Sequence, residues 1–257
     1  MARTFRRLMR ERAYRNGLGQ WVRRAETMPA LSRGAVARLR SHAAELREVL
    51  DRVLFDAERR LLADAPAIRP VPWPPGADWA WRPDPWAGPI TPHALVAPAS
   101  ATPLAGDVTL FHDGRLAEVL VRQKAGSGAE PAAPFCVVVE TLGFDGGFVS
   151  LTLDLPAEAS AGLRRRHILR LDLAAGCEHP LAGFARLNIG QGPEVAQLVQ
   201  AFHPDGSVRT IEFDLAGIDI DEKRIGRLWI DLILEQPAMN RVTLHDVTAS
   251  RLPRAEI

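Results

Sequence analysis

The sequence of 257 residues has no long apolar run. A helix that crosses a bilayer needs about 20 mostly apolar residues, and no stretch of this chain comes near that length. Residues 1–24 also have no central apolar segment of the kind found in secretory signals, so the pair Arg6-Arg7 does not indicate a twin-arginine signal. These absences predict no transmembrane segment and a cytoplasmic location.

Cysteine and the common catalytic motifs are scarce as well. Cys136 and Cys177 lie in or beside apolar runs, which predicts buried free thiols rather than a disulfide framework. The chain has no HExxH motif for zinc, no GxSxG serine motif, and no glycine-rich loop that leads into a phosphate-binding helix. The sequence therefore predicts no catalytic residues and no metal ligands, and it favours binding over catalysis.

The net charge of +1 conceals an uneven distribution. Residues 1–24 hold eight arginines and one glutamate, a net charge of +7, and residues 25–64 are neutral, so the remainder carries −6. A basic segment on an acidic body predicts docking on a phosphate backbone, an anionic membrane or the acidic face of a protein. The alternative is a solvated, frayed terminus. The arginines proposed to make this contact are Arg3, Arg6, Arg7, Arg10, Arg12 and Arg15.

Residues 1–65 predict a basic helical arm. A short amphipathic helix is expected from Arg3 to Arg15, where Asn16-Gly17 should end it. A second helix is expected from about Ser32 until Pro66 ends it. Its apolar residues recur at alternating steps of three and four, which is a heptad pattern; they are Val36, Leu39, Ala43, Leu46, Leu50, Val53 and Ala57. This stripe predicts packing within the chain or a homo-oligomer formed through residues 32–63.

Residues 66–105 form a wrap or linker that is rich in proline and tryptophan. Eleven prolines fall in this stretch, so neither helix nor strand is expected there. It also holds four of the six tryptophans, Trp73, Trp79, Trp81 and Trp86. They predict either an exposed stacking platform for a sugar or a proline-rich peptide, or apolar anchors that hold an extended segment on the β domain. We favour anchoring, because such a segment has few backbone hydrogen bonds of its own.

Residues 106–257 predict a β domain, because apolar and polar residues alternate in about ten segments separated by turn signals. Val149, Leu151 and Leu153, for example, alternate with polar residues. One apolar face on each strand means that two sheets pack face to face. The predicted fold class is therefore mainly β, an antiparallel jelly-roll β-sandwich preceded by an N-terminal α-helical arm.

The order of the strands over about residues 76–251 resembles the jelly-roll β-sandwich of carbohydrate-binding modules and galactose-binding-like domains. Residues 228–232, the turn at 236–240 and residues 242–247 carry most of this likeness. The whole chain also resembles an uncharacterised family of alphaproteobacterial proteins with a basic N-terminus. The first resemblance implies a structural calcium, and the counterparts of its ligands would be Asp107, Glu140 and Asp246.

Outward-facing polar residues form the candidate ligand site. Trp229, flanked by Arg227 and Asp231, offers an indole face with hydrogen-bonding groups beside it, as sugar binding requires. Further outward residues would join this site if their strands are neighbours; they are Arg170, Asp172, Glu212 and Asp214. The alternative is a solvated face crossed by charge pairs. The same-face acid pairs Glu212 with Asp214, and Asp231 with Glu235, raise the possibility of glycoside hydrolysis.

Three functions follow from these patterns. The favoured function is a non-catalytic recognition module, which binds a glycan or protein through the sandwich and docks or oligomerises through the arm. The second is a structural or assembly protein, such as a phage-like surface component. The third is a carbohydrate-active enzyme.

Overall fold

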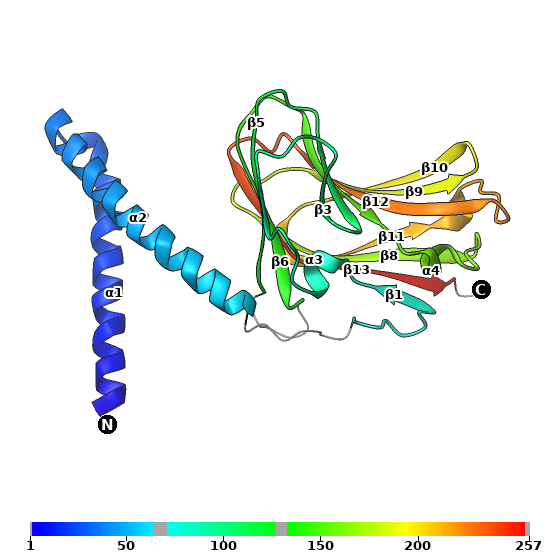
Figure 1. The fold of residues 1–257 in the computed structure, drawn as a ribbon, viewed down its shortest axis with the longest axis horizontal. Helices are drawn as coiled ribbons and strands as arrows, with labels where there is room; N and C mark the ends of the chain where they lie inside the picture. Colours follow the sequence, from blue (N-terminus) through cyan, green and yellow to red (C-terminus); the bar gives the residue numbers. More distant parts are fainter. Residues whose placement is uncertain (1, 64–70, 127–132, 255–257) are drawn as a thin grey trace. The chain divides into compact units, whose positions relative to one another are not determined.

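The computed structural model describes residues 2–63, 71–126 and 133–254 (Figure 1). Contacts within the chain separate two compact units, Met1–Arg59 and Arg60–Ile257. The first is helical and the second is a β-sandwich. No helix among the described residues is long and apolar enough to cross a membrane.

The helical unit contains α1 (Ala2–Thr27), the short η1 (Met28–Ala30) and α2 (Arg33–Ala63), the last of which extends beyond it. The predicted break at Asn16-Gly17 is wrong, because α1 continues through both residues. A single glycine costs a helix only about 1 kcal/mol relative to alanine, and the arginines and apolar residues on both sides favour the helix. α2 begins as predicted, where the amide of Val36 donates to the carbonyl of Ser32.

The heptad stripe of α2 is only partly covered within its own unit. Val36, Leu39 and Ala43 line a groove together with Trp21 of α1 and Met28 of η1. Further along the same stripe, Leu46, Leu50 and Val53 are exposed. Val36 and Leu39 are half-buried, whereas Ala43 and the described residues of the stripe after it are exposed, so packing within the arm covers only the start of the stripe.

The second unit consists of two sheets with antiparallel pairing throughout. Sheet A has the order β11-β8-β13-β6-β5-β2, with β1 beside β13; sheet B has the order β10-β9-β12-β7-β4-β3. The strands of sheet A are β1 (Trp79–Trp81), β2 (Ala94–Val96), β5 (Ala117–Ala125), β6 (Phe135–Phe144), β8 (His167–Cys177), β11 (Asp205–Asp214) and β13 (Asn240–Pro253). Those of sheet B are β3 (Thr102–Ala105), β4 (Val108–His112), β7 (Phe148–Asp154), β9 (Gly183–Gln191), β10 (Glu194–Phe202) and β12 (Ile225–Glu235). From β6 onward, successive strands change sheet except at the β9–β10 hairpin. The predicted mainly β fold, an antiparallel jelly-roll sandwich, is confirmed.

The core lies between the two sheets and follows the predicted alternation. On β12, Leu228, Ile230, Leu232 and Leu234 are all buried, whereas Trp229 between them is only half-buried. Each fully buried leucine of this kind contributes about 1.5–3 kcal/mol relative to an exposed one. The same alternation gives sheet B an outer face that is not part of the core, and the candidate site lies on that face.

The prediction that residues 66–105 contain neither helix nor strand is wrong. This stretch supplies β1, β2 and β3 and the short helix α3 (Asp84–Ala87). β1 contains no proline, and β2 and β3 are the last strands of their sheets, where a missing backbone N–H removes no ladder hydrogen bond. The prolines therefore restrict this segment to edges and turns without excluding strands.

Three of the four tryptophans in this segment anchor it to the sandwich. Trp86 is fully buried, and its indole N–H donates to the carbonyl of Leu244 at 2.8 Å. Trp79 is buried and stacks on the half-buried Trp81, with ring centroids 6.4 Å apart. Trp73 differs, since it is 61% exposed. The anchoring interpretation therefore holds for Trp79, Trp81 and Trp86.

Both cysteines are free thiols, but only Cys136 is buried. Cys177 is partly exposed at the end of β8, where its thiol donates to the carbonyl of Pro204 at 2.9 Å. The predicted burial is thus confirmed for Cys136 and wrong for Cys177, because β8 ends at the surface.

Candidate functional site

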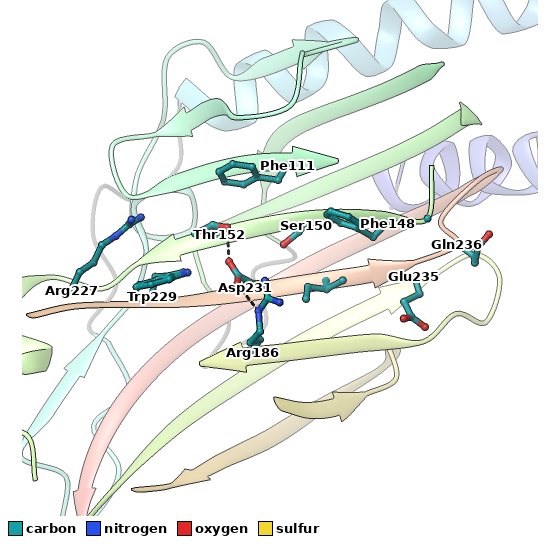
Figure 2. A pocket seen from close by; sticks show the side chains of 12 residues that line it. Phe111, Phe148, Ser150, Thr152, Arg186, Arg227, Trp229, Asp231, Glu235 and Gln236 are labelled. Atoms are coloured by element: carbon teal, nitrogen blue, oxygen red, sulfur yellow. Dashed lines mark hydrogen bonds and ion pairs between the residues drawn. The ribbon is translucent and has the colours of Figure 1, made fainter. Parts of the chain in front are cut away.

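A groove of about 710 Å³ lies on the outer face of sheet B (Figure 2). Strands β4, β7, β9 and β12 supply most of its lining, and the turns after β6 and β12 close one end. The lining residues are Phe111, Gly147, Phe148, Ser150, Thr152, Arg186, Arg227, Trp229, Asp231, Ile233, Glu235 and Gln236.

The strand register brings these residues together. Ile233 of β12 pairs with Ser150 of β7, which in turn pairs with Phe111 of β4. Two residues away, Asp231 lies between Thr152 of β7 and Arg186 of β9. Because directly paired residues point to the same side of a sheet, each row presents all of its side chains to the groove.

The groove has an apolar floor with aromatic side chains. Phe111, Phe148, Trp229 and Ile233 are all half-buried, so each keeps part of its surface accessible. The guanidinium of Arg227 lies 4.8 Å from the centre of the Trp229 ring, and its Nε donates to Asp154 at 2.6 Å. This cation–π contact and ion pair hold the indole at one end of the groove.

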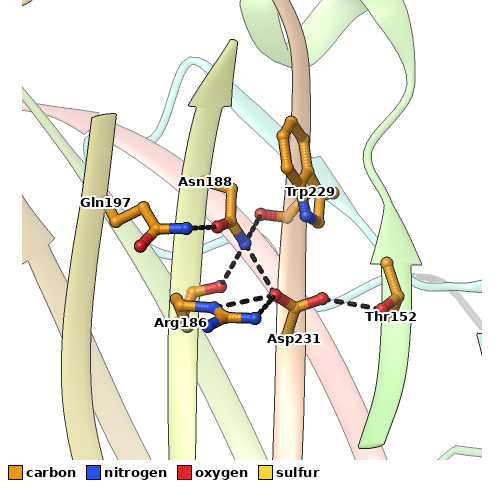
Figure 3. A network of polar contacts seen from close by, with 6 residues as sticks. All are labelled: Thr152, Arg186, Asn188, Gln197, Trp229 and Asp231. Atoms are coloured by element: carbon orange, nitrogen blue, oxygen red, sulfur yellow. Dashed lines mark hydrogen bonds and ion pairs between the residues drawn. The ribbon is translucent and has the colours of Figure 1, made fainter. Parts of the chain in front are cut away.

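A polar network centred on Asp231 occupies the middle of the groove (Figure 3). One carboxylate oxygen of Asp231 accepts from the hydroxyl of Thr152 at 2.6 Å. The other accepts from Arg186 Nε at 3.0 Å and from the amide of Asn188 at 2.9 Å. The side-chain amide of Gln197 donates to the Asn188 carbonyl oxygen at 2.8 Å.

This network supplies hydrogen-bond partners to a carboxylate that is only 5% exposed. A buried charge is tolerated when it has an opposite charge and hydrogen bonds on its remaining lone pairs. Both oxygens of Asp231 are occupied, so its role is to fix Arg186 and Thr152 at the groove surface rather than to contact a ligand directly.

The structure divides the seven predicted ligand residues between two sheets. Trp229, Arg227 and Asp231 lie in the groove of sheet B, and the other four lie on β8 and β11 of sheet A. The expectation that all seven could share one face is therefore wrong. Strand parity in the sequence shows which side chains point outward, but it does not show which sheet a strand joins.

Three of the four residues on sheet A are engaged in charge pairs. Arg170 donates to both carboxylate oxygens of Asp172, which also accepts from Thr210 at 2.6 Å. These hydrogen bonds to Asp172 raise the pKa of Arg170. Glu212 lies opposite Arg170 in the register. Asp214 accepts from the amide of Ala216 at the start of the short helix η2 (Leu215–Gly217) and pairs with Arg254.

The arginines proposed for anionic docking can be placed only in part. Arg12 and Arg15 are exposed on α1. The side chains of Arg3, Arg6, Arg7 and Arg10 lie outside the described residues.

The three acids proposed as calcium ligands are not brought together. Glu140 pairs with Arg122 at 2.7 Å, and Asp246 pairs through both oxygens with Arg82. Within residues 2–63, 71–126 and 133–254, no three His, Cys, Asp or Glu side chains are arranged to hold a metal. The calcium hypothesis is therefore not supported.

Asp107, the third of these acids, lies in an unusual environment. Burial raises its pKa to about 6, and the nearby charges of Asp84 and Asp154 act in the same direction. One oxygen accepts from the amide of Asp84 at 2.9 Å, an interaction that opposes the shift. The other is buried without a hydrogen-bond partner.

Several groove residues were not among the predicted ligand residues. Phe111, Phe148 and Arg186 lie on β4, β7 and β9 and point to the outer face, so the alternation of apolar and polar residues carries information on which face they occupy. The missing information was the order β9-β12-β7-β4, which places their strands beside Trp229.

Comparison with known protein families shows which family the chain belongs to. A family model described as "Family of unknown function (DUF6478)" matches residues 1–257. The chain belongs to this family. No curated protein matches the chain.

The sandwich is similar to several solved structures. A family 11 carbohydrate-binding module from Clostridium thermocellum, in complex with a β-1,3-1,4-mixed-linked tetrasaccharide, is 14% identical with a TM-score of 0.40, and the match covers 60% of this chain and 92% of that one. TmCBM61 in complex with β-1,4-galactotriose is 16% identical with a TM-score of 0.34, covering 61% and 92%. Tailspike protein 4 of bacteriophage CBA120 is 9% identical with a TM-score of 0.42, covering 58% and 19%. The matches include carbohydrate-binding modules, whose architecture the sequence resembles. Because the TM-scores are low, these matches support no conclusion about function.

Proposed function

We propose that this protein is a non-catalytic recognition module that binds a glycan in the groove of sheet B. One observation carries the proposal: a groove with three half-buried aromatic side chains and an ordered row of polar groups between them. A pyranose ring has apolar faces and a polar rim, so it needs an apolar platform beside hydrogen-bonding groups. Trp229 and Phe148 supply platforms at the two ends, and Arg186, Ser150 and Gln236 supply polar groups.

The dimensions of the groove favour a chain of sugars over a single one. Trp229 is paired with Asp154, and Phe148 lies six residues earlier on the same strand as Asp154. At about 3.3 Å per residue, the two aromatic ends are about 20 Å apart. A ligand that reaches both ends must therefore contain several linked rings, and affinity should rise with the number of rings until both ends are occupied.

The carboxylates of the groove favour binding over hydrolysis. Glycosidases use two acids about 5–10 Å apart. Asp231 and Glu235 are four residues apart on β12, a separation of about 13 Å along the strand. Both oxygens of Asp231 are already bonded. The groove therefore fits recognition better than acid–base chemistry.

Affinity electrophoresis of the full chain through gels that contain soluble polysaccharides tests this proposal. We expect retention by at least one polysaccharide, and Trp229→Ala should abolish it because the stacking platform is lost. Trp73→Ala is the matched control, since it removes an exposed tryptophan outside the groove. Equal retention of the two variants would refute the groove as the binding site.

We further propose that the arm docks the protein on an anionic partner. The net charge of +7 over residues 1–24 and the exposure of Arg12 and Arg15 support this role. Binding to anionic vesicles or DNA should then weaken steeply as salt rises. Binding that is insensitive to salt would contradict electrostatic docking.

An assembly role is the second candidate function. The exposed second half of the α2 stripe, Leu46, Leu50 and Val53, supports it. A protein of this kind would be incorporated into a larger structure through residues 32–63 and would display the sandwich.

A further inference from the structure

The edges of the two sheets differ in how they are protected from pairing with another strand. Sheet A ends in β2, which has three residues, and in β11, which carries Arg209 and Glu212 and shifts register between Asp205 and Val208. Sheet B ends in β3, which has four residues including Pro103, and in β10. Short length, charge, proline and irregular register are the features that keep natural edge strands from pairing further.

Strand β10 has none of these features beyond one charge at its first residue. Its nine residues, Glu194–Phe202, pair with β9 without a shift in register, and they contain no charge after Glu194 and no proline or glycine. In the described part of the chain, β9 is the only strand paired with β10. Val195 and Val199 on its outer side are 46% and 53% exposed. A nine-residue edge with a regular register and charge only at its first residue offers its backbone N–H and C=O groups to a further strand.

We propose that β10 pairs antiparallel with β10 of a second copy of this chain, so that sheet B continues across a two-fold axis. In a register centred on Leu198, the outward residues of one copy meet the outward residues of the other; they are Val195, Gln197, Val199 and Ala201. Glu194 then lies opposite Phe202, and the pairing creates no contact between like charges. This self-complementarity favours a second copy over a charged peptide, for which β10 has no opposite charge to offer.

Sedimentation equilibrium of the full chain over a wide range of concentrations tests the interface. The wild type should form a dimer, and Val199→Glu should weaken it by about ten-fold or more, because the two glutamates lie close together across the axis. In a single copy the new side chain lies opposite Arg186 of β9, so the fold tolerates it, and circular dichroism verifies this. Val195→Lys provides a second disruption of the same edge.

Val208→Glu is the matched control, because Val208 is 69% exposed on β11, the edge strand of sheet A. This variant should dimerise like the wild type. A wild type that stays monomeric would overturn the proposal. So would a dimer that survives Val199→Glu and Val195→Lys but dissociates with Leu50→Lys on α2, since the interface would then lie in the arm. The proposed interface does not depend on the ligand of the groove.

Discussion

The outer faces of sheets A and B use their charged side chains in different ways. On sheet A, Arg122 pairs with Glu140 and Arg170 with Asp172, and these partly exposed pairs leave a surface of neutralised charges. On sheet B, one buried carboxylate holds several polar groups in place, and half-buried aromatic side chains lie on either side of it. Two sheet faces that share the same alternation of apolar and polar residues can therefore differ in whether their polar and aromatic side chains are available to bind a ligand.

The largest difference is expected when the central carboxylate of each face is removed. Asp231→Ala leaves the buried donors of Thr152 and Asn188 without their acceptor and should cost about 2–4 kcal/mol of folding free energy. Asp172→Ala removes a more exposed carboxylate, whose side chain is 21% exposed against 7% for Asp231, and should cost about 1 kcal/mol. Urea denaturation of both variants measures the difference. Equal costs would mean that the Asp231 network is no more than a surface ion pair.

Removing the charge of Asp107, a half-buried carboxylate with no ion-pair partner among the described residues, should instead stabilise the fold at neutral pH. The folded-state pKa of Asp107 is raised to about 6, so its contribution to stability is present below about pH 4 and is lost as the pH rises through about 6. Asp107→Asn should therefore be more stable than the wild type at pH 7.5, by about 1 kcal/mol after allowance for partial exposure. The two proteins should converge near pH 4.

Thermal unfolding at a series of pH values checks this prediction. Asp246→Asn is the comparison variant, since it removes the negative charge that pairs with Arg82. It should lose stability at neutral pH, where Asp107→Asn gains it. A loss of stability in both variants would show that the Asp107 carboxylate is favourably solvated or bonded.

A smaller effect should distinguish the two faces in ligand binding. Phe148→Ala removes the aromatic platform at the end of the groove opposite Trp229 and should weaken retention by a polysaccharide by about five-fold, or about 1 kcal/mol. Leu142→Ala removes an exposed apolar side chain from β6 of sheet A and should leave retention unchanged. Affinity electrophoresis compares the two, and an equal loss in both would remove the distinction between the faces.

The sequence predicted the parts of the fold that depend on local periodicity. The alternation of Leu228, Ile230, Leu232 and Leu234 identified both the buried and the outward sides of β12. It could not assign strands to sheets, because pairing such as that of Trp229 with Asp154 joins residues far apart in the chain. For this reason Trp229 was predicted as a site residue, Phe148 was not, and the four residues of sheet A were grouped with it wrongly.

The incorrect predictions outside the site also arose because local sequence patterns do not show the tertiary contacts of a segment. Asn16-Gly17 is a local break signal that the surrounding helix formers outweigh. The strand β1 is too short to show a period, and it exists because β13 pairs with it. The sequence favoured anchoring for Trp86, but it could not show the partner of the indole N–H, which is the carbonyl of Leu244 on the distant strand β13.

The most direct test of the central claim is hydroxyl-radical footprinting of the full chain with and without a polysaccharide that retains it. The account predicts protection of Trp229, Phe148 and Phe111, and no change at Leu142 or Trp73. Protection of Leu142 or Trp73 with Trp229 unchanged, or retention by no polysaccharide at all, would contradict glycan binding in the groove of sheet B.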